Sequence, residues 1–253
     1  MARRTLFFAV FAIAVSLGCV RLGFWQVSRL RERQARNAAV VERLRFPPAP
    51  VTALPADTGV RFRRSWAEGR YDFAHELVLA GRSRLGSPGV HILTPLRLTG
   101  SDTAVLVNRG WVYSADGVRV DLVRWREPEQ AHVEGFVEEF SREPAPVRTP
   151  SFERAVRRLN LDSIRARVPY PIHAVVLVQQ RDSGVAAAAA SGTPVRAEPP
   201  PLGEGSHRAY AVQWFGFALV GLVGTAMVVL RDRQRGRGRS RGEGARPLPG
   251  PTG

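Results

Sequence analysis

Histidine is the side chain best suited to bind a metal or transfer a proton near neutral pH. The chain has five histidines, at His75, His91, His132, His173 and His207. Three of them lie in strand-like runs, where a hydrogen-bonded structural histidine is the more common role. His207 differs, because it stands two residues before a long apolar segment and its imidazole could face a cofactor held at a bilayer surface. The alternative role for His207 is a polar anchor at the membrane interface.

No motif of a known catalytic centre accompanies these histidines. The sequence lacks a GxSxG nucleophile elbow, a phosphate-binding GxxxxGKS/T loop and an HExxH zinc motif. The single cysteine, Cys19, excludes an intramolecular disulfide and a zinc site built from several cysteines. We therefore predict no catalytic residues and no enzymatic activity.

The charge of the chain is strongly basic but says little about its partners. All 37 basic residues are arginine, against 22 acidic residues. The complete absence of lysine indicates a compositional bias of the genome rather than a device for binding phosphate. No nucleic-acid-binding module is recognisable, and we predict no nucleic-acid partner.

A second membrane span is predicted near the C-terminus. Ala209–Leu230 contains 22 uncharged residues, enough at about 1.5 Å per residue to cross a hydrocarbon layer of roughly 30 Å. Tyr210 and Trp214 stand near its start, where aromatic side chains favour the interface. Glycines in this segment would allow another helix to approach closely, at Gly216, Gly221 and Gly224.

The first membrane span is predicted at residues 5–27. Arg21 interrupts it near its outer end, where an arginine can extend toward the lipid headgroups, and Trp25 follows one turn later at the interface. Cleavage is an alternative, because Ser16-Leu17-Gly18-Cys19 resembles a lipoprotein processing site with serine in place of the bulky aliphatic residue.

Arginine counts predict that both termini are cytoplasmic. The N-terminus begins Met-Ala-Arg-Arg, and the tail after the second span carries seven arginines against two acidic residues. Four arginines between positions 29 and 36 count against this orientation, but two spans still place both termini on one side. We expect the cell inner (plasma) membrane as the location.

Between the spans, the sequence predicts a mainly β domain, and hence an α+β membrane protein. Residues 28–44 lack glycine and proline, so the first helix is expected to continue beyond the bilayer until Phe46-Pro47-Pro48. Short runs rich in Val, Leu, Thr and aromatic residues predict strands at 65–73, 76–83, 90–98, 103–113, 131–140 and 173–180. An amphipathic helix is expected at Phe152–Arg167.

These patterns divide the chain into consecutive segments. They are a cytoplasmic N-terminus (1–4), transmembrane helix 1 (5–27), an extracytoplasmic mainly β domain with a helical extension (28–181), a flexible Ala/Gly/Pro linker (182–206), transmembrane helix 2 (207–230) and a basic cytoplasmic tail (231–253). Nothing folded is expected in the linker. Glu68-Gly69 and Glu134-Gly135 lie inside strand-like runs, where glycine marks a bulge or a close backbone approach.

Five blocks of residues follow one another in the order found in one protein family. The blocks are Leu22-Gly23-Phe24-Trp25-Gln26 with Arg29; Glu68-Gly69-Arg70-Tyr71-Asp72; Gly86-Ser87-Pro88-Gly89-Val90 with Leu93-Thr94-Pro95-Leu96; Val107-Asn108-Arg109-Gly110-Trp111-Val112; and His207, Tyr210-Ala211 and Gln213-Trp214-Phe215. In these blocks the chain resembles the surfeit locus cytochrome c oxidase assembly proteins, called Shy in yeast. The blocks cover roughly residues 20–220.

The resemblance implies an assembly factor for haem-copper cytochrome c oxidase that assists haem a insertion into the large catalytic subunit. The expected partners are that subunit, other oxidase assembly factors, the haem a synthesis machinery and the membrane. In bacterial members the protein is considered to bind haem a, and the histidine that heads the second membrane helix corresponds to His207. The resemblance therefore makes His207 the candidate ligand of the haem iron.

Other site residues follow from the same resemblance. Tyr210 and Trp214 lie three and seven residues after His207, on the same helix face, and could wall a haem slot. Trp25, Gln26 and Arg29 lie at the membrane surface of the first helix. Gln26 and Arg29 share a face and could meet the haem propionates, or the three residues could be interfacial anchors only.

The fourth block has two readings. Arg109 and Trp111 could dock to an oxidase subunit or to haem propionates. The alternative is structural, with Trp111 buried by a turn and Arg109 paired locally. Gly69 and Gly89 are most simply explained as positions where a side chain would clash.

Two further functions remain open. One is a membrane scaffold that stabilises an oxidase assembly intermediate without binding haem. The other is a processed lipoprotein or an extracytoplasmic enzyme, which loss of mass after residue 18 or turnover by the purified soluble domain would support.

Overall fold

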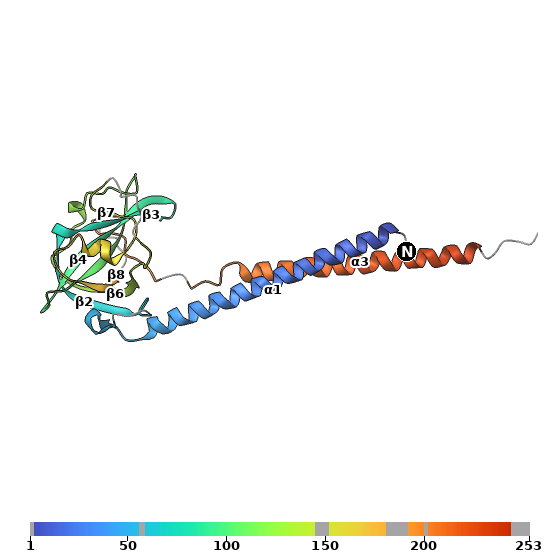
Figure 1. The fold of residues 1–253 in the computed structure, drawn as a ribbon, viewed down its shortest axis with the longest axis horizontal. Coiled ribbons are helices and arrows are strands. Elements are labelled where there is room, and N and C mark those ends of the chain that lie inside the picture. The colour runs from blue at the N-terminus through green and yellow to red at the C-terminus, as the bar shows by residue number, and fades with distance from the viewer. Residues whose placement is uncertain (1–2, 56–58, 145–151, 181–191, 200–201, 244–253) are drawn as a thin grey trace, which may run out of the picture. The chain divides into compact units, whose positions relative to one another are not determined.

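The computed structural model describes residues 3–55, 59–144, 152–180, 192–199 and 202–243 (Figure 1). Its contacts divide the chain into two units. Met1–Ala38 and Leu202–Gly253 form the first unit, which holds two long helices. Ala39–Pro201 forms the second, which is mainly β structure.

The two helices are α1, Arg3–Arg45, and α3, His207–Glu243. α1 has no proline and ends just before Phe46-Pro47-Pro48, which confirms the prediction that it continues past residue 27. Only 22% of the most apolar stretch of α1 and 11% of that of α3 are buried within the protein. Both helices are therefore long and apolar enough to cross a membrane, which is compatible with the two predicted spans.

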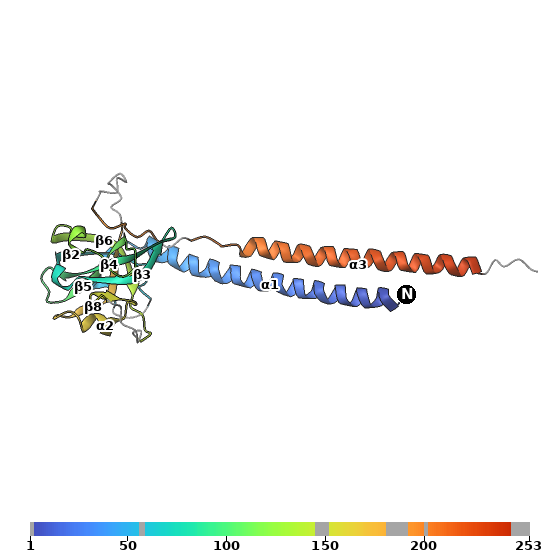
Figure 2. The same cartoon turned by 90° about the horizontal axis from the view of Figure 1, so that it is seen from above.

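The two helices lie side by side and antiparallel (Figure 2). Phe24 meets Phe215 edge to face, with ring centroids 5.4 Å apart. Farther along, Gly221 lies against Ser16, so contacts move toward the start of α1 as α3 proceeds. Among the described residues, no atom outside the local helix lies within 4 Å of a Cβ added at Gly216 or Gly224. Of the three glycines predicted to allow close approach, Gly221 is thus the one that does so.

The second unit is built on one sheet whose central strands close into a barrel-like ring. Its elements are β1 (Ala49–Pro50), η1 (Val51–Ala53), β2 (Arg64–Tyr71), η2 (Phe73–His75), β3 (Leu77–Arg84), β4 (Ser87–Leu98), β5 (Ala104–Tyr113), η3 (Val123–Trp125), β6 (Gln130–Glu139), β7 (Ala155–Val156), α2 (Leu161–Arg165) and β8 (Ile172–Gln179). The strand order is β1-β2-β6-β8-β5-β4-β3-β7, and β2 also pairs with β4. The ring therefore runs β2-β6-β8-β5-β4 and back to β2.

The core of this unit is divided by the sheet. One cluster takes apolar side chains from every strand of the ring and so fills its interior, including Val105 and Val107 of β5. Leu106 points the other way, into a cluster with Leu79 and Ile164 that α2 covers. β5 is buried on both faces, which explains its uninterrupted apolar run Ala104–Val107.

The strand predictions are confirmed for β2, β3, β4, β5, β6 and β8, with no end displaced by more than three residues. The helix predicted at Phe152–Arg167 is wrong over most of its length. Asn160 caps a helix that begins only at Leu161, because its side chain accepts a hydrogen bond from the Ser163 backbone N–H at 3.0 Å. Ala155 and Val156 instead form β7, which pairs in parallel with β3.

The prediction that nothing in the linker is folded is also wrong at Val195, although residues 182–191 and 200–201 of the linker lie outside the described residues. Val195 and Trp111 exchange two backbone hydrogen bonds of 2.8 Å, N–H to C=O in each direction. This edge of β5 lies beyond the last residue that β8 pairs with, and the returning chain satisfies it. Gly110 permits the approach, since its φ is +126° and a Cβ would overlap the Val195 carbonyl.

The close backbone approaches predicted at the glycines are confirmed. A Cβ at Gly69 would overlap the Arg97 carbonyl oxygen, and one at Gly135 would overlap that of Val178. Gly89 has the same restriction from the Trp111 side chain and the backbone of β5. These glycines allow the strands of the ring to pack at the required separation.

Candidate functional site

The first unit brings His207 of α3 into contact with Gln26 of α1. The imidazole Nδ1 lies 2.9 Å from the Gln26 side-chain oxygen Oε1. An amide oxygen only accepts, so Nδ1 carries a proton, and in the neutral form of the ring the lone pair is on Nε2. The contact therefore sets the imidazole tautomer that leaves Nε2 available to a metal.

Side chains of α1 also fix the segment that leads into α3. Arg33 Nε donates to the Gly203 carbonyl at 2.6 Å, and Asn37 Nδ2 donates to the Leu202 carbonyl at 2.9 Å. Gln26, Arg33 and Asn37 are spaced seven and four residues apart, so they lie on one face of α1. The position of His207 is thus determined by a row of polar contacts along the first helix.

Tyr210 and Trp214 lie in the first turns of α3, and Trp25 is adjacent to Gln26 on α1. Tyr210 is 48% exposed and Trp25 is 51% exposed, while Trp214 is half-buried with its ring 5.9 Å from that of Phe217. Sequence reasoning missed Phe215, whose ring would be overlapped by a Cβ at Gly23. Its adjacent position in the last of the five blocks was the available signal.

Arg29, another candidate residue, contacts side chains of its own helix. Its Nη1 lies 2.9 Å from Oε2 of Glu32, and both side chains are about half exposed. Its guanidinium also lies 5.8 Å from the centre of the Trp25 ring. Gln26 and Arg29 therefore face different partners, and contact of Arg29 with a propionate stays a prediction.

In the second unit, Arg109 is completely buried. It is the extra residue of a β-bulge, because Ile92 pairs with Gly110 while Leu93 pairs with Asn108. The bulge directs its guanidinium into the protein and away from any surface where a partner could reach it.

Two carboxylates surround the Arg109 guanidinium. Nη1 lies 2.9 Å from Glu76, which is also fully buried, and Nη2 lies 2.8 Å from Glu127. Nη1 also donates to Thr94, and Nη2 to the Trp125 carbonyl. Burial raises the pKa of Glu76, and the hydrogen bond from Thr94 and the charge of Arg109 oppose that rise. This geometry favours the structural alternative for Arg109.

Trp111 is half-buried beside this network. Its indole Nε1 is buried and has no hydrogen-bond partner among the described residues. Arg196, which follows the Val195 bridge, pairs with Glu127 and donates to the Arg109 carbonyl. A partner contact in this block would therefore fall to Trp111, and that role stays a prediction.

Comparison with known protein families covers the region that contains these residues. The model of the SURF1 family matches residues 13–219, most of the chain. The chain belongs to the SURF1 family. The matched region includes Gln26, Arg109 and His207, so it covers most of α1, the β domain and the first part of α3.

Individual SURF1 relatives are distant. A SURF1-like protein of Monosiga brevicollis is 30% identical over 105 residues, 37% of this chain and 40% of that protein. Surfeit locus protein 1 of Takifugu rubripes is 28% identical over 107 residues, 36% of this chain and 45% of that protein. A SURF1-like protein of Rickettsia conorii is 30% identical over 113 residues, 44% of each. The chain thus spans less than half the length of the curated relatives it matches.

Proposed function

We propose that this chain is an assembly factor for haem-copper cytochrome c oxidase and that it assists haem a insertion into the large catalytic subunit. The observation that carries the proposal is the contact of His207 with Gln26, which joins the first and last of the five family blocks. The donor set fits a haem, because one imidazole nitrogen is free to ligate and aromatic side chains lie nearby.

The residues of the first unit have separate parts in this function. Gln26 holds the imidazole of His207 in the tautomer that exposes the Nε2 lone pair. Trp25, Tyr210 and Trp214 supply apolar surface. Bound haem a would supply an iron that His207 could ligate, and the chain would present the cofactor without altering it, so we propose no enzymatic step.

Visible absorption spectroscopy of the full chain tests this function. Wild type, His207→Ala and Gln26→Leu are co-expressed with haem a synthesis and purified in detergent. We expect a haem a spectrum in wild type and its loss in His207→Ala. In Gln26→Leu we expect haem a affinity to fall by about tenfold or more, as is usual when the hydrogen-bond partner of a metal ligand is removed. His132→Ala, which removes an exposed histidine of the other unit, is the matched control and should retain haem.

A colourless wild type, under conditions where a known haem a protein loads, would contradict haem carriage. The second candidate function, a scaffold that stabilises an oxidase assembly intermediate without haem, would then take precedence. The contact of Gln26 with His207 also favours it, because a hydrogen bond between membrane helices stabilises their packing without any ligand. Copurification of the oxidase large subunit with a colourless wild type would support that scaffold.

We also propose that the protein lies in the cell inner (plasma) membrane with both termini cytoplasmic. The antiparallel helices support placing both ends on one side, and the arginine-rich tail supports the cytoplasmic side. A reporter that is active only in the cytoplasm should be active when it is fused to either terminus. The proposed partners are the oxidase large subunit, other assembly factors and the haem a synthesis machinery.

A further inference from the structure

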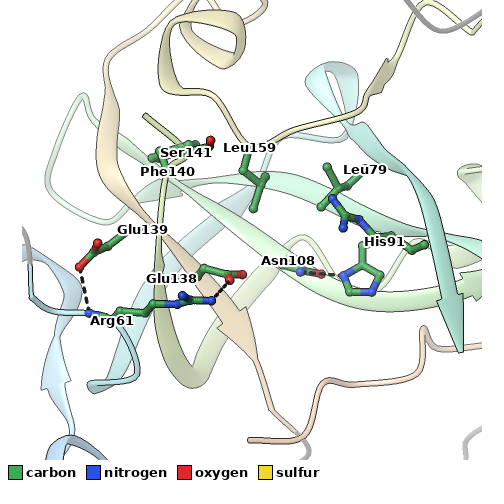
Figure 3. Close-up of a pocket in the computed structure, with 10 residues that line it drawn as sticks. Arg61, Leu79, His91, Asn108, Glu138, Glu139, Phe140, Ser141 and Leu159 are labelled. Carbon is green, nitrogen blue, oxygen red and sulfur yellow. Dashed lines mark hydrogen bonds and ion pairs between the residues drawn. The ribbon is translucent and has the colours of Figure 1, made fainter. Parts of the chain in front are cut away.

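A cavity of about 510 Å³ lies in the second unit, apart from the residues proposed to bind haem (Figure 3). It opens over β3, β4, β5 and β6. One wall is apolar and consists of Leu79, Phe140 and Leu159. The size is within the range of sites for small organic ligands, roughly 300–1,000 Å³. Its polar side chains decide which ligand would fit.

His91 is held in one tautomer at this cavity. The Asn108 oxygen Oδ1 accepts from the Gly110 backbone N–H at 3.1 Å, which turns the amide Nδ2 toward His91. Nδ2 lies 2.9 Å from the imidazole Nδ1 and donates to it (Figure 3). The proton of the neutral ring is therefore on Nε2, which has no hydrogen-bond partner among the described residues. His91 therefore has an N–H donor at Nε2 that is free to bind a ligand.

The imidazole stays neutral at physiological pH. Burial, reinforced by the positive charge of Arg82, lowers the pKa of His91 to about 4. The ring therefore adds no charge of its own to the cavity, and the positive charge that acts on it is that of Arg82.

Arg82 is the cation of this cavity that lacks a carboxylate partner among the described residues. Its one hydrogen bond there runs from Nη2 to the Arg157 carbonyl at a long 3.5 Å. The other arginine, Arg61, lies 3.1 Å from Glu138 and is neutralised by it. Glu139 accepts hydrogen bonds from the backbone at Gly59 and Arg61. The carboxylate of Glu139 is thus bound by backbone N–H groups, whereas Arg82, whose charge acts on His91, has a buried Nε without a hydrogen-bond partner among the described residues.

We propose that this cavity binds a small ligand that carries a carboxylate on an apolar body. The carboxylate would pair with Arg82 and accept from His91 Nε2, an arrangement of charge-assisted hydrogen bonds. The apolar body would cover Leu79, Phe140 and Leu159. Haem ligation by His207 is not needed for this binding, so the two proposals can fail separately.

Nuclear magnetic resonance of the histidine side chains tests the proposal on the full chain in detergent. The probe is 2-naphthoate, and 2-naphthamide is the matched neutral compound of the same shape. The His91 resonance is assigned with His91→Gln. We expect saturable shifts of the His91 signal with naphthoate and at least about tenfold weaker binding of the amide, as the loss of a charged hydrogen-bond partner predicts.

Variants locate the charge. Arg82→Gln should weaken naphthoate binding about tenfold or more. Arg119→Gln, which removes an exposed arginine that does not line the cavity, should leave it unchanged. Leu159→Trp should weaken naphthoate and naphthamide alike by filling the cavity, and serves if Arg82→Gln does not fold.

Three results would overturn the proposal. They are no saturable shift at His91, equal binding of naphthoate and naphthamide, and binding that neither variant of the cavity changes. Inorganic phosphate is an additional probe, and phosphate as strong as naphthoate would show that the apolar wall has no part in binding.

Discussion

Replacing Arg109 with methionine should strongly destabilise the β domain. The side chains of Arg109 and Glu76 are both 0% exposed and their charged atoms are 2.9 Å apart. Arg109→Met leaves the Glu76 carboxylate in the interior with a hydrogen bond from Thr94 and a more distant arginine, Arg126, at 3.7 Å. Removing one partner of a buried ion pair costs about 3–5 kcal/mol. For a domain of this size, the melting temperature should fall by about 6–20 °C.

Urea unfolding of the purified full chain, followed by tryptophan fluorescence, measures this change. Arg70→Met is the matched control, because Arg70 pairs with Glu129 on the surface, where the side chains are 70% and 53% exposed. An exposed pair contributes at most about 1 kcal/mol. Arg109→Met combined with Glu76→Gln should recover part of the loss, since the unpaired charge is gone.

Two results would refute this account of Arg109. One is a loss of stability in Arg109→Met no greater than in Arg70→Met. The other is a double variant whose loss equals the sum of the two single losses, because the residues would then act independently. Either result would show that the ion pair of Arg109 with Glu76 does not stabilise the domain in this way.

Three further variants test other features of the β domain. The pKa of His91 is about 4 in the folded chain, so between pH 6.5 and 4 the imidazole binds a proton in the unfolded chain but not in the folded one. Lowering the pH across this range should therefore reduce the free energy of unfolding by up to about 3 kcal/mol. Urea unfolding should show that His91→Gln removes this part of the pH dependence. Gly110→Ala should displace Val195 and increase tryptic cleavage at the arginine that follows it; an unchanged digest would contradict the bridge. Gly135→Ala should destabilise the domain by about 2 kcal/mol or more, because its Cβ would overlap the Val178 carbonyl; urea midpoints equal to wild type would disprove that contact.

The sequence carried enough information for the long elements. An apolar run of 22 residues predicts a helix, and a stretch without proline predicts that the first helix continues. The strands of the ring were predictable because each is a run of β-favouring residues between turn residues. β7 could not be predicted in this way, because two residues show no period and Ala155–Val156 also fits a helix face. Only the strand pairing offered by β3 decides between the two conformations.

The candidate site was predictable where residues flank the two predicted membrane spans and less so inside the β domain. The position of Gln26 beside the second helix was anticipated, because both flank a membrane span. The ion pair of Arg109 with Glu76 was not, since it depends on a bulge that redirects one side chain of β5. His91 was taken for a structural histidine, and nothing in the sequence places Arg82 beside it.

The segment between β8 and α3 is attached at two points, so the position of His207 does not depend on the length of the linker. Val195 is held by the edge of β5, and Leu202 and Gly203 are held by α1. Residues inserted between β8 and Val195 would add length upstream of both attachments. Relatives with longer or shorter connections at this point can therefore keep the same histidine position, and the connection is a suitable place for an affinity tag or a protease site.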